Sequence, residues 1–378
     1  MEIFDFVWTY IIPFLVVLTI LVYVHELGHY WVAVKAGVRV EVFSIGFGPE
    51  LYGWNNKAGT RWKISAIPMG GYVKMFGQSD SEPDSKQENE AEEPLSEEDK
   101  KVSFAHKTLS QRTAIVAAGP IANFIFAIVV FFGLAWIVGT PVPHAGIGSV
   151  MPGSAAESAG MMESDRIIAI DGKEINLFSD LQVVIRSNAG TELNVIVLRD
   201  GSEISLFVTP KLITGASGET YGQLGVTPDP EQIEYESISF FDSMWFGVER
   251  TWGMITGILS YLGEIFSGDR GTEDLGGPLR IAQISGDMAQ GGIINLIVFM
   301  AALSVNLGLI NLFPIPMLDG GHLVFYGAEF IRGKPVGQKA QEYSFGFGLI
   351  LLVMIFAFVT WNDLEHFRVF EFIKDLVS

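Results

Sequence analysis

The chain has 378 residues, of which 49% are hydrophobic and 18% are charged, and its formal charge at pH 7 is -19. This composition excludes a disordered chain, and the excess of acidic residues excludes a nonspecific nucleic-acid binder, which needs a basic surface. The chain has no cysteine, so disulfide frameworks, thiolate metal sites and cysteine nucleophiles are excluded too. Any metal site must therefore use His, Asp or Glu.

Four apolar stretches are each close to the roughly 20 residues that cross the hydrocarbon core of a bilayer. The first runs straight into HELGHYWVAVKAG and lacks the basic start and small-residue cleavage site of a signal peptide, so we interpret it as a retained span. The sequence therefore predicts a polytopic α-helical membrane protein with four transmembrane helices. The stretches are residues 6–34, 113–139, 293–318 and 345–361.

Lysine and arginine are unevenly distributed between these spans. The 35–112 segment carries 11 of them in 78 residues and the short 332–340 segment carries three, whereas the 140–294 segment carries eight in 155 residues. By the positive-inside rule the first two segments are cytoplasmic and the third is outside. Both chain termini are then expected outside as well.

The first cytoplasmic segment has two halves of opposite character. Residues 37–76 alternate aromatic and β-branched residues with Gly and Pro, which is typical of short strands joined by tight turns, so 35–77 is expected to be a membrane-associated β-hairpin region. Residues 78–100 hold ten acidic residues and almost nothing apolar. We therefore predict a flexible acidic loop over 78–112, with an acidic docking site as the alternative.

The outer segment begins with PVPHAGIGSVMPGSAAESAGMMESDRIIAIDGKEI. Short strands, a helix around Ser154–Ala159 and a turn at Asp171-Gly172 predict one inserted β-rich domain over 140–215. The order S-x-A-x-x-A-G followed by D-x-I-x-x-I-D-G resembles a PDZ domain of the bacterial protease-associated type. A generic β-barrel insertion is the alternative.

His25-Glu26-Leu27-Gly28-His29 lies inside the first apolar stretch. On a helix His25 and His29 share a face, so both imidazoles can reach one zinc ion while Glu26 can reach its water. Three such side chains are expensive to insert into a membrane and indicate a functional site. A polar cluster that stabilises helix packing is the alternative.

A hydrolytic zinc site needs a third protein ligand and one open position. Asp319 is the candidate, because the prolines and glycines of NLFPIPMLDGGH break the third apolar stretch and such a break is tolerated where it lines a cavity. His322 is the competing candidate. Residues 240–266 are long enough for a fifth span, but that crossing would carry Asp319 to the opposite side, and their central charges favour an interfacial amphipathic helix.

Three motifs in order resemble the site-2 protease family: HELGH in the first span, GPIANF at residues 119–124, and NLFPIPMLDGGH. The segment FSIGFG…KISAIPMGGYVKM and the PDZ-like insertion resemble its bacterial regulator-of-sigma-E protease branch. The best-known members of that branch carry two tandem PDZ domains and this chain has one. The resemblance implies a multi-pass zinc protease of the bacterial inner membrane, with the PDZ domain and both termini periplasmic.

The resemblance also implies roles for individual residues. His25, His29 and Asp319 would be the Zn2+ ligands, and Glu26 would be the catalytic glutamate. The strands around residues 63–74 offer an edge onto which an unwound substrate segment can add. Asn311 matches the family's ligand for the substrate backbone, with a helix-packing amide as the alternative, and Asn123 matches a position near the catalytic centre. The expected substrate-binding residues are Asn311, Asn123, Ile67, Gly70, Gly71 and Val73.

The implied partners are single-span membrane proteins already trimmed on the outer side, such as anti-sigma factors, and remnant signal peptides. The PDZ groove could bind a peptide. A catalytically inactive membrane PDZ scaffold and a zinc transporter are the rival functions. The expected organisation is spans in 1–34, 113–139, 293–322 and 345–378, the last with a C-terminal tail, cytoplasmic segments 35–77, 78–112 and 323–344, the PDZ-like domain 140–215, and a periplasmic connector 216–292.

Overall fold

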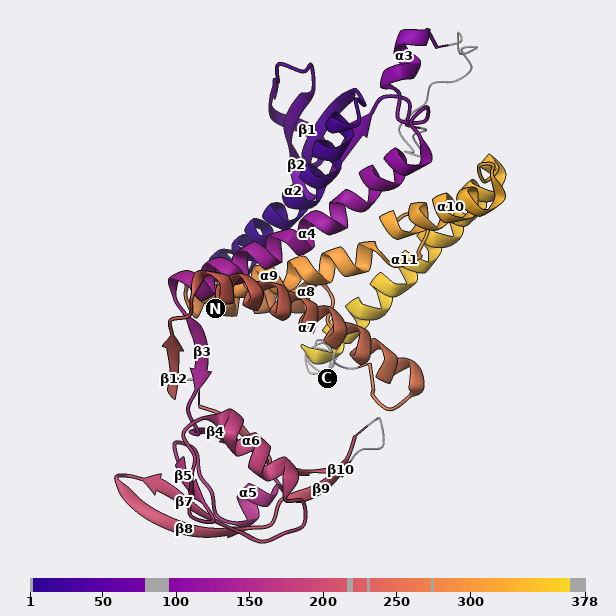
Figure 1. The fold of residues 1–378 in the computed structure, drawn as a ribbon. Coiled ribbons are helices and arrows are strands. Elements are labelled where there is room, and N and C mark those ends of the chain that lie inside the picture. Colours follow the sequence, from indigo (N-terminus) through magenta and orange to yellow (C-terminus); the bar gives the residue numbers. More distant parts are fainter. Residues whose placement is uncertain (1–2, 79–94, 216–219, 230–231, 273–274, 368–378) are drawn as a thin grey trace, which may run out of the picture. The chain divides into compact units, whose positions relative to one another are not determined.

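The computed structural model describes residues 3–78, 95–215, 220–229, 232–272 and 275–367 (Figure 1). The chain divides into two compact units, which are considered separately. The membrane unit consists of Met1–Phe131, Gly247–Gly263 and Gly271–Ser378, and the second unit consists of Phe132–Phe246 and Glu264–Arg270.

Four helices among the described residues are long and apolar enough to cross a membrane, which confirms the predicted number of spans. Fewer than half of the residues in each apolar window are buried inside the protein, so their remaining apolar surface is available to lipid. The first span, Val7–Lys35, consists of the π-helical turn η1 (Val7–Ile11) and α2 (Ile12–Lys35), and it follows the short helix α1 (Ile3–Phe6). The other three are α4 (Leu109–Ile137), α9 (Ile293–Asn311) and α11 (Gln338–His366).

A β-hairpin packs alongside α2 (Figure 1). Its strands are β1 (Val40–Asn55) and β2 (Arg61–Met75), in the region where the sequence predicted strands. Phe43 of β1 is fully buried and lies edge-to-face against Tyr23 and Tyr30 of α2. These aromatic contacts fix the hairpin to the helix that carries both histidines of HELGH.

Two segments that were expected to be loops are partly helical. Helix α3 (Glu97–Val102) begins after the capping residue Ser96, and α4 begins at Leu109. The prediction of a flexible loop over 78–112 is therefore wrong for residues 97–102 and 109–112. Residues 79–94 of that segment lie outside the described part. Helix α10 (Asp319–Arg332) occupies much of the predicted 323–344 loop. Both helices are short, and α3 is almost entirely charged, so neither gives the long apolar signal that identified the spans.

The second unit is rich in strands. Its main sheet has the order β6-β5-β7-β8, and residues of β5, β7 and α6 form its hydrophobic core. Asp171 and Gly172 both have positive φ at the turn between β5 and β6, where an Asp-Gly pair is favoured. The bounds are β3 (Thr140–Pro143), β4 (Ile147–Val150), α5 (Ala155–Ser158), β5 (Arg166–Ile170), β6 (Lys173–Glu174), α6 (Phe178–Ser187), β7 (Leu193–Arg199), β8 (Ser202–Val208), β9 (Lys211–Thr214), β10 (Thr220–Gln223), β11 (Val226–Pro228) and β12 (Ile233–Glu236).

A buried ion pair supports this unit. The Asp165 side chain has no exposed surface and accepts hydrogen bonds from Arg199 Nε and Nη2, each at 2.6 Å. These bonds raise the pKa of Arg199 above its ordinary value. The pair joins the loop before β5 to the end of β7.

Two helices connect the second unit to α9. Helix α7 (Phe240–Ser267) is not among the four apolar candidates, and it exposes Phe241, Trp245 and Trp252. Helix α8 (Pro278–Gln290) packs against η1 and α2. The buried carboxylate of Asp363 accepts hydrogen bonds from the backbone nitrogens of Gly277 and Leu279, at 2.7 and 2.9 Å, and so caps α8.

Candidate metal centre

Helix α2 places two histidines on one face, as their spacing of four predicts. The Nε2 atoms of His25 and His29 lie 3.2 Å apart, and the two residues are only 8% and 9% exposed. Their rings meet edge-to-face with centroids 4.8 Å apart. Both imidazoles therefore present the same nitrogen to one point.

The carboxylate of Asp319 completes the group. Asp319 is the first residue of α10, and its Oδ2 lies 3.1 Å from His25 Nε2 and 3.4 Å from His29 Nε2. This buried oxygen nevertheless has no well-aligned hydrogen bond among the described residues. Three possible ligand atoms thus converge on one point, and the group of residues could hold a metal ion.

The separations are close to those between the ligands of a zinc ion. Zn–N and Zn–O bonds are about 2.0–2.2 Å long, and ligands of a tetrahedral ion are then about 3.3–3.6 Å apart. The three atom pairs are 3.1, 3.2 and 3.4 Å apart, so the third lies within this range and the other two lie just below it. Two imidazoles and one carboxylate form a donor set that zinc accepts, with one tetrahedral position left for water or substrate.

One face of α4 supports the two imidazoles. Ile115 O lies 2.9 Å from His29 Nδ1, so it accepts that N–H and directs Nε2 toward Asp319. One turn later, a Cβ on Gly119 would overlap His29 Nε2 and lie 2.9 Å from His25 Cε1. The bare backbone of Gly119 therefore leaves the space that the two rings occupy.

The same helices approach closely at Gly28. A Cβ on Gly28 would overlap Ala118 O and lie 2.8 Å from Ala122 Cβ. Small residues allow such contact between membrane helices. Gly28 lies within HELGH and Gly119 within GPIANF, but only the structure shows that each is required by the backbone of the neighbouring helix or by the imidazoles.

A cavity of about 470 Å³ opens beside the three residues. Glu26 lines it, together with Asn311 at the end of α9. His322 also lines it, but its ring lies against Phe345 and it is not part of the group of three. Asp319, and not His322, therefore meets the two histidines.

The predicted substrate-binding residues fall into separate places. Asn311 and Val73 line the cavity, and Gly71 lies so close to α2 that a Cβ there would be 2.9 Å from Val22 and 3.3 Å from Glu26 Cγ. Ile67 is half exposed on β2. Asn123 is fully buried, does not line the cavity, and places its Nδ2 3.2 Å from His25 Nδ1. Its burial argues against the expected contact of Asn123 with substrate.

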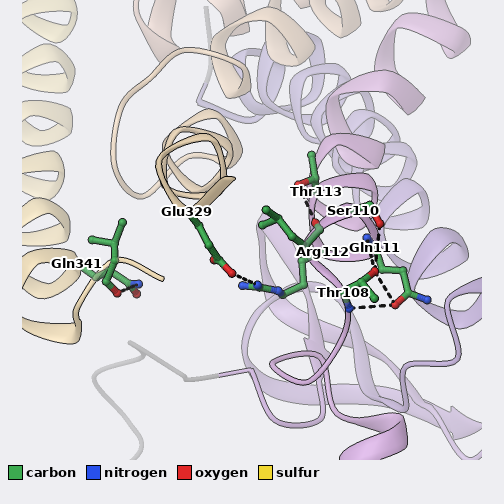
Figure 2. Close-up of polar contacts among 9 residues, drawn as sticks. Thr108, Ser110, Gln111, Arg112, Thr113, Glu329 and Gln341 are labelled. Atoms are coloured by element: carbon green, nitrogen blue, oxygen red, sulfur yellow. Dashed lines mark hydrogen bonds and ion pairs between the residues drawn. The ribbon is translucent and has the colours of Figure 1, made fainter. Parts of the chain in front are cut away.

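An ion pair that the sequence did not reveal joins α4, which supports the imidazoles, to α10, which carries Asp319. Arg112 Nη2 of α4 lies 2.6 Å from Glu329 Oε1 of α10, and both side chains are more than four-fifths buried (Figure 2). Thr108 and Gln111 cap the start of α4 beside it. Because Arg112 is 217 residues from Glu329 in the chain, no local pattern could have predicted the pair.

The model of peptidase family M50 matches residues 13–355. The chain belongs to peptidase family M50. It is 43% identical to a protein of Agrobacterium fabrum that carries the name zinc metalloprotease, over 95% of this chain and 97% of the relative. A second relative of that name, from Rhizobium meliloti, is 42% identical over 94% and 96%. The regulator of sigma-E protease of Salmonella typhimurium is 32% identical over 93% of this chain and 98% of that protein.

The chain is therefore a membrane-embedded zinc metalloprotease of the site-2 protease family, as its motifs indicated. The alignment with the Salmonella protein extends over 453 positions, more than the 378 residues of this chain. That relative thus contains additional sequence. Neither rival function, the inactive scaffold nor the transporter, agrees with the family.

Replacing Gly119 with Ala should weaken zinc binding by roughly 5- to 150-fold, because the new Cβ displaces His29 and overpacking costs about 1–3 kcal/mol. Gly133→Ala is the matched control, since a Cβ at that position of α4 meets nothing within 4 Å. Zinc affinity is measured by competition with a chelator. Equal affinities of the two variants would contradict the requirement for a bare backbone at Gly119.

Proposed function

We propose that this protease hydrolyses peptide bonds within the transmembrane segments of single-span membrane proteins. In this proposal His25, His29 and Asp319 hold the zinc ion and Glu26 is the general base. The observation that carries the assignment is the triangle of Nε2, Nε2 and Oδ2 atoms, 3.1–3.4 Å apart and so close to tetrahedral spacing, beside a cavity that Glu26 lines. Two of the three atoms belong to α2, a helix long and apolar enough to span the membrane.

The chain's own groups supply the steps of hydrolysis. Glu26 takes a proton from the attacking water and returns it to the leaving amine. A bound zinc ion supplies Lewis acidity, which polarises the scissile carbonyl and lowers the pKa of water. Asn311 is positioned to hold the substrate backbone, since it lines the cavity and its Nδ2 donates to Leu307 O one turn back, which orients the amide.

Strand addition is the proposed mode of substrate binding. Residues 42–45 of β1 pair with 61–64 of β2 and also with 71–74 of β2. The 71–73 segment therefore has one edge paired with β1, and its other edge has no strand partner among the described residues. Tyr72 and Val73 line the catalytic cavity, so a substrate segment that pairs with this edge would pass Glu26 in extended form.

An apolar cavity supports a transmembrane substrate. It has a volume of about 310 Å³ and lies among α2, β2, α8 and α9. Gly70 lines it, directly before the edge segment, and Leu21 lines it one helical turn before His25. Apolar side chains of an unwound membrane segment could enter this cavity while the adjacent backbone lies beside Glu26. Ile67, Gly70, Gly71 and Val73 are accordingly proposed to contact substrate.

The proposed location is the bacterial inner membrane. The distribution of Lys and Arg supports periplasmic termini and a periplasmic 140–215 domain. The exposed aromatic residues of α7 support an interfacial position for 240–266. A cavity of about 230 Å³ between α6 and the β10–β11 region is the proposed peptide groove of the PDZ-like domain.

Anti-sigma factors and remnant signal peptides are the proposed substrates. Both are single-span segments, which agrees with a site reached from within the membrane. The name of the Salmonella relative, regulator of sigma-E protease, supports the first class.

Glu26→Gln should lower cleavage of a single-span substrate by about 10²–10⁴-fold while zinc stays bound, because the amide cannot accept a proton. Asp319→Ala should lose zinc as well as activity, whereas His322→Ala should retain zinc. Turnover in detergent and zinc content of purified protein provide the two readouts. Full zinc content in Asp319→Ala would move the third-ligand role to another residue.

Adjacent prolines test strand addition. Successive N–H groups of a strand point to opposite edges, so of Tyr72→Pro and Val73→Pro one removes a donor to β1 and the other removes a donor from the free edge. The variant that removes the donor from the free edge should lose turnover and keep both its zinc content and its thermal stability. Two fully active variants would argue against pairing with substrate at this edge.

A further inference from the structure

Asn123 is a polar side chain that the proposed reaction does not use directly. It has no exposed surface, although it lies on a helix that otherwise buries apolar and small residues. Its amide nitrogen is 3.2 Å from His25 Nδ1, and its Oδ1 has no hydrogen-bond partner among the described residues. Burying an amide costs free energy unless its polar atoms have hydrogen-bond partners.

The chemistry of a histidine ligand indicates which group the amide oxygen of Asn123 would bind. A neutral imidazole that binds a metal through Nε2 carries its proton on Nδ1, and this N–H needs an acceptor. His29 has such an acceptor in Ile115 O, at 2.9 Å. For His25 the atom facing Nδ1 belongs to the amide of Asn123. Rotating the amide by 180° about Cβ–Cγ exchanges its oxygen and nitrogen, and it brings the acceptor to Nδ1.

We propose that Asn123 is a positioning residue for His25: its Oδ1 accepts the Nδ1–H and holds Nε2 unprotonated toward the metal. This inference rests on the proposed role of His25 as a zinc ligand. Ile115, Gly119 and Asn123 follow one another at intervals of four on α4, so one stripe of this helix supplies an acceptor for His29, a gap for both rings, and an acceptor for His25.

The packing role of this position can be separated from the amide. The hydroxyl of Ser304 on α9 donates to the backbone oxygen of Asn123 at 2.9 Å and so joins the two helices without using the Asn123 side chain. Ser304→Ala therefore perturbs the same helix contact and leaves the proposed acceptor in place. It is the matched control for substitutions of the side chain.

The test measures the zinc dissociation constant of the full-length protein in detergent by chelator competition. The variants are Asn123→Leu, Asn123→Ala, Asn123→Asp and Ser304→Ala, with His25→Ala as the reference for a lost ligand. Loss of an outer hydrogen-bond partner typically weakens metal affinity about 10–100-fold. We expect that loss in the Leu and Ala variants, and we expect the Asp variant, which retains an acceptor, and Ser304→Ala to stay within a few-fold of wild type.

Cobalt substitution adds a readout that packing alone does not change. The visible absorption of the Co2+ form should differ from wild type in the Leu and Ala variants and match it in the Asp variant. The proposal would be overturned if Asn123→Ala kept the wild-type zinc affinity and spectrum. It would also be overturned if Ser304→Ala and Asn123→Asp lost as much zinc affinity as Asn123→Ala. If His25→Ala itself keeps wild-type zinc affinity, the proposed ligand set fails, and that result is distinct from a failure confined to Asn123.

Discussion

The close approach of α2 and α4 is the constraint on which the metal centre depends. Two imidazoles one turn apart need a neighbouring helix that offers hydrogen-bond acceptors and no bulk between them. Gly28 brings the helices together, and Gly119 leaves the space that His25 and His29 occupy. Because the helices meet inside an apolar region, a misplaced polar group is costly there, and the protein must provide the orientation of each ring.

The third element of the centre comes from a chain break. Helix α9 ends at Asn311 and α10 begins at Asp319, and between them Met317 has a φ of 87°. The break lets a carboxylate enter the site from a helix terminus. The Arg112–Glu329 pair holds α10 against the helix that supports His29 (Figure 2). A few contacts of α4 therefore position all three side chains of the proposed metal centre.

The sequence predicted the features that local patterns encode. The four spans, the hairpin region and the Asp171-Gly172 turn could all be read from composition and spacing. Spacing also paired the two histidines of HELGH, whereas the choice of Asp319 over His322 rested on the resemblance to the family. The short helices α3 and α10 were missed because they lack a long apolar pattern. The Arg112–Glu329 pair, the gap at Gly119 and the contact of Asn123 with His25 depend on residues distant in the chain or on backbone proximity, which one sequence does not encode locally.

Zinc-edge X-ray absorption of the purified protein would test the proposed metal centre most directly. We expect one zinc per chain, coordinated by two imidazole nitrogens and by carboxylate or water oxygens at about 2.0–2.2 Å. In the His25→Ala, His29→Ala double variant, the zinc should be lost. Zinc coordination without imidazole, or stoichiometric zinc in the double variant, would contradict the assignment of His25, His29 and Asp319 as the metal ligands.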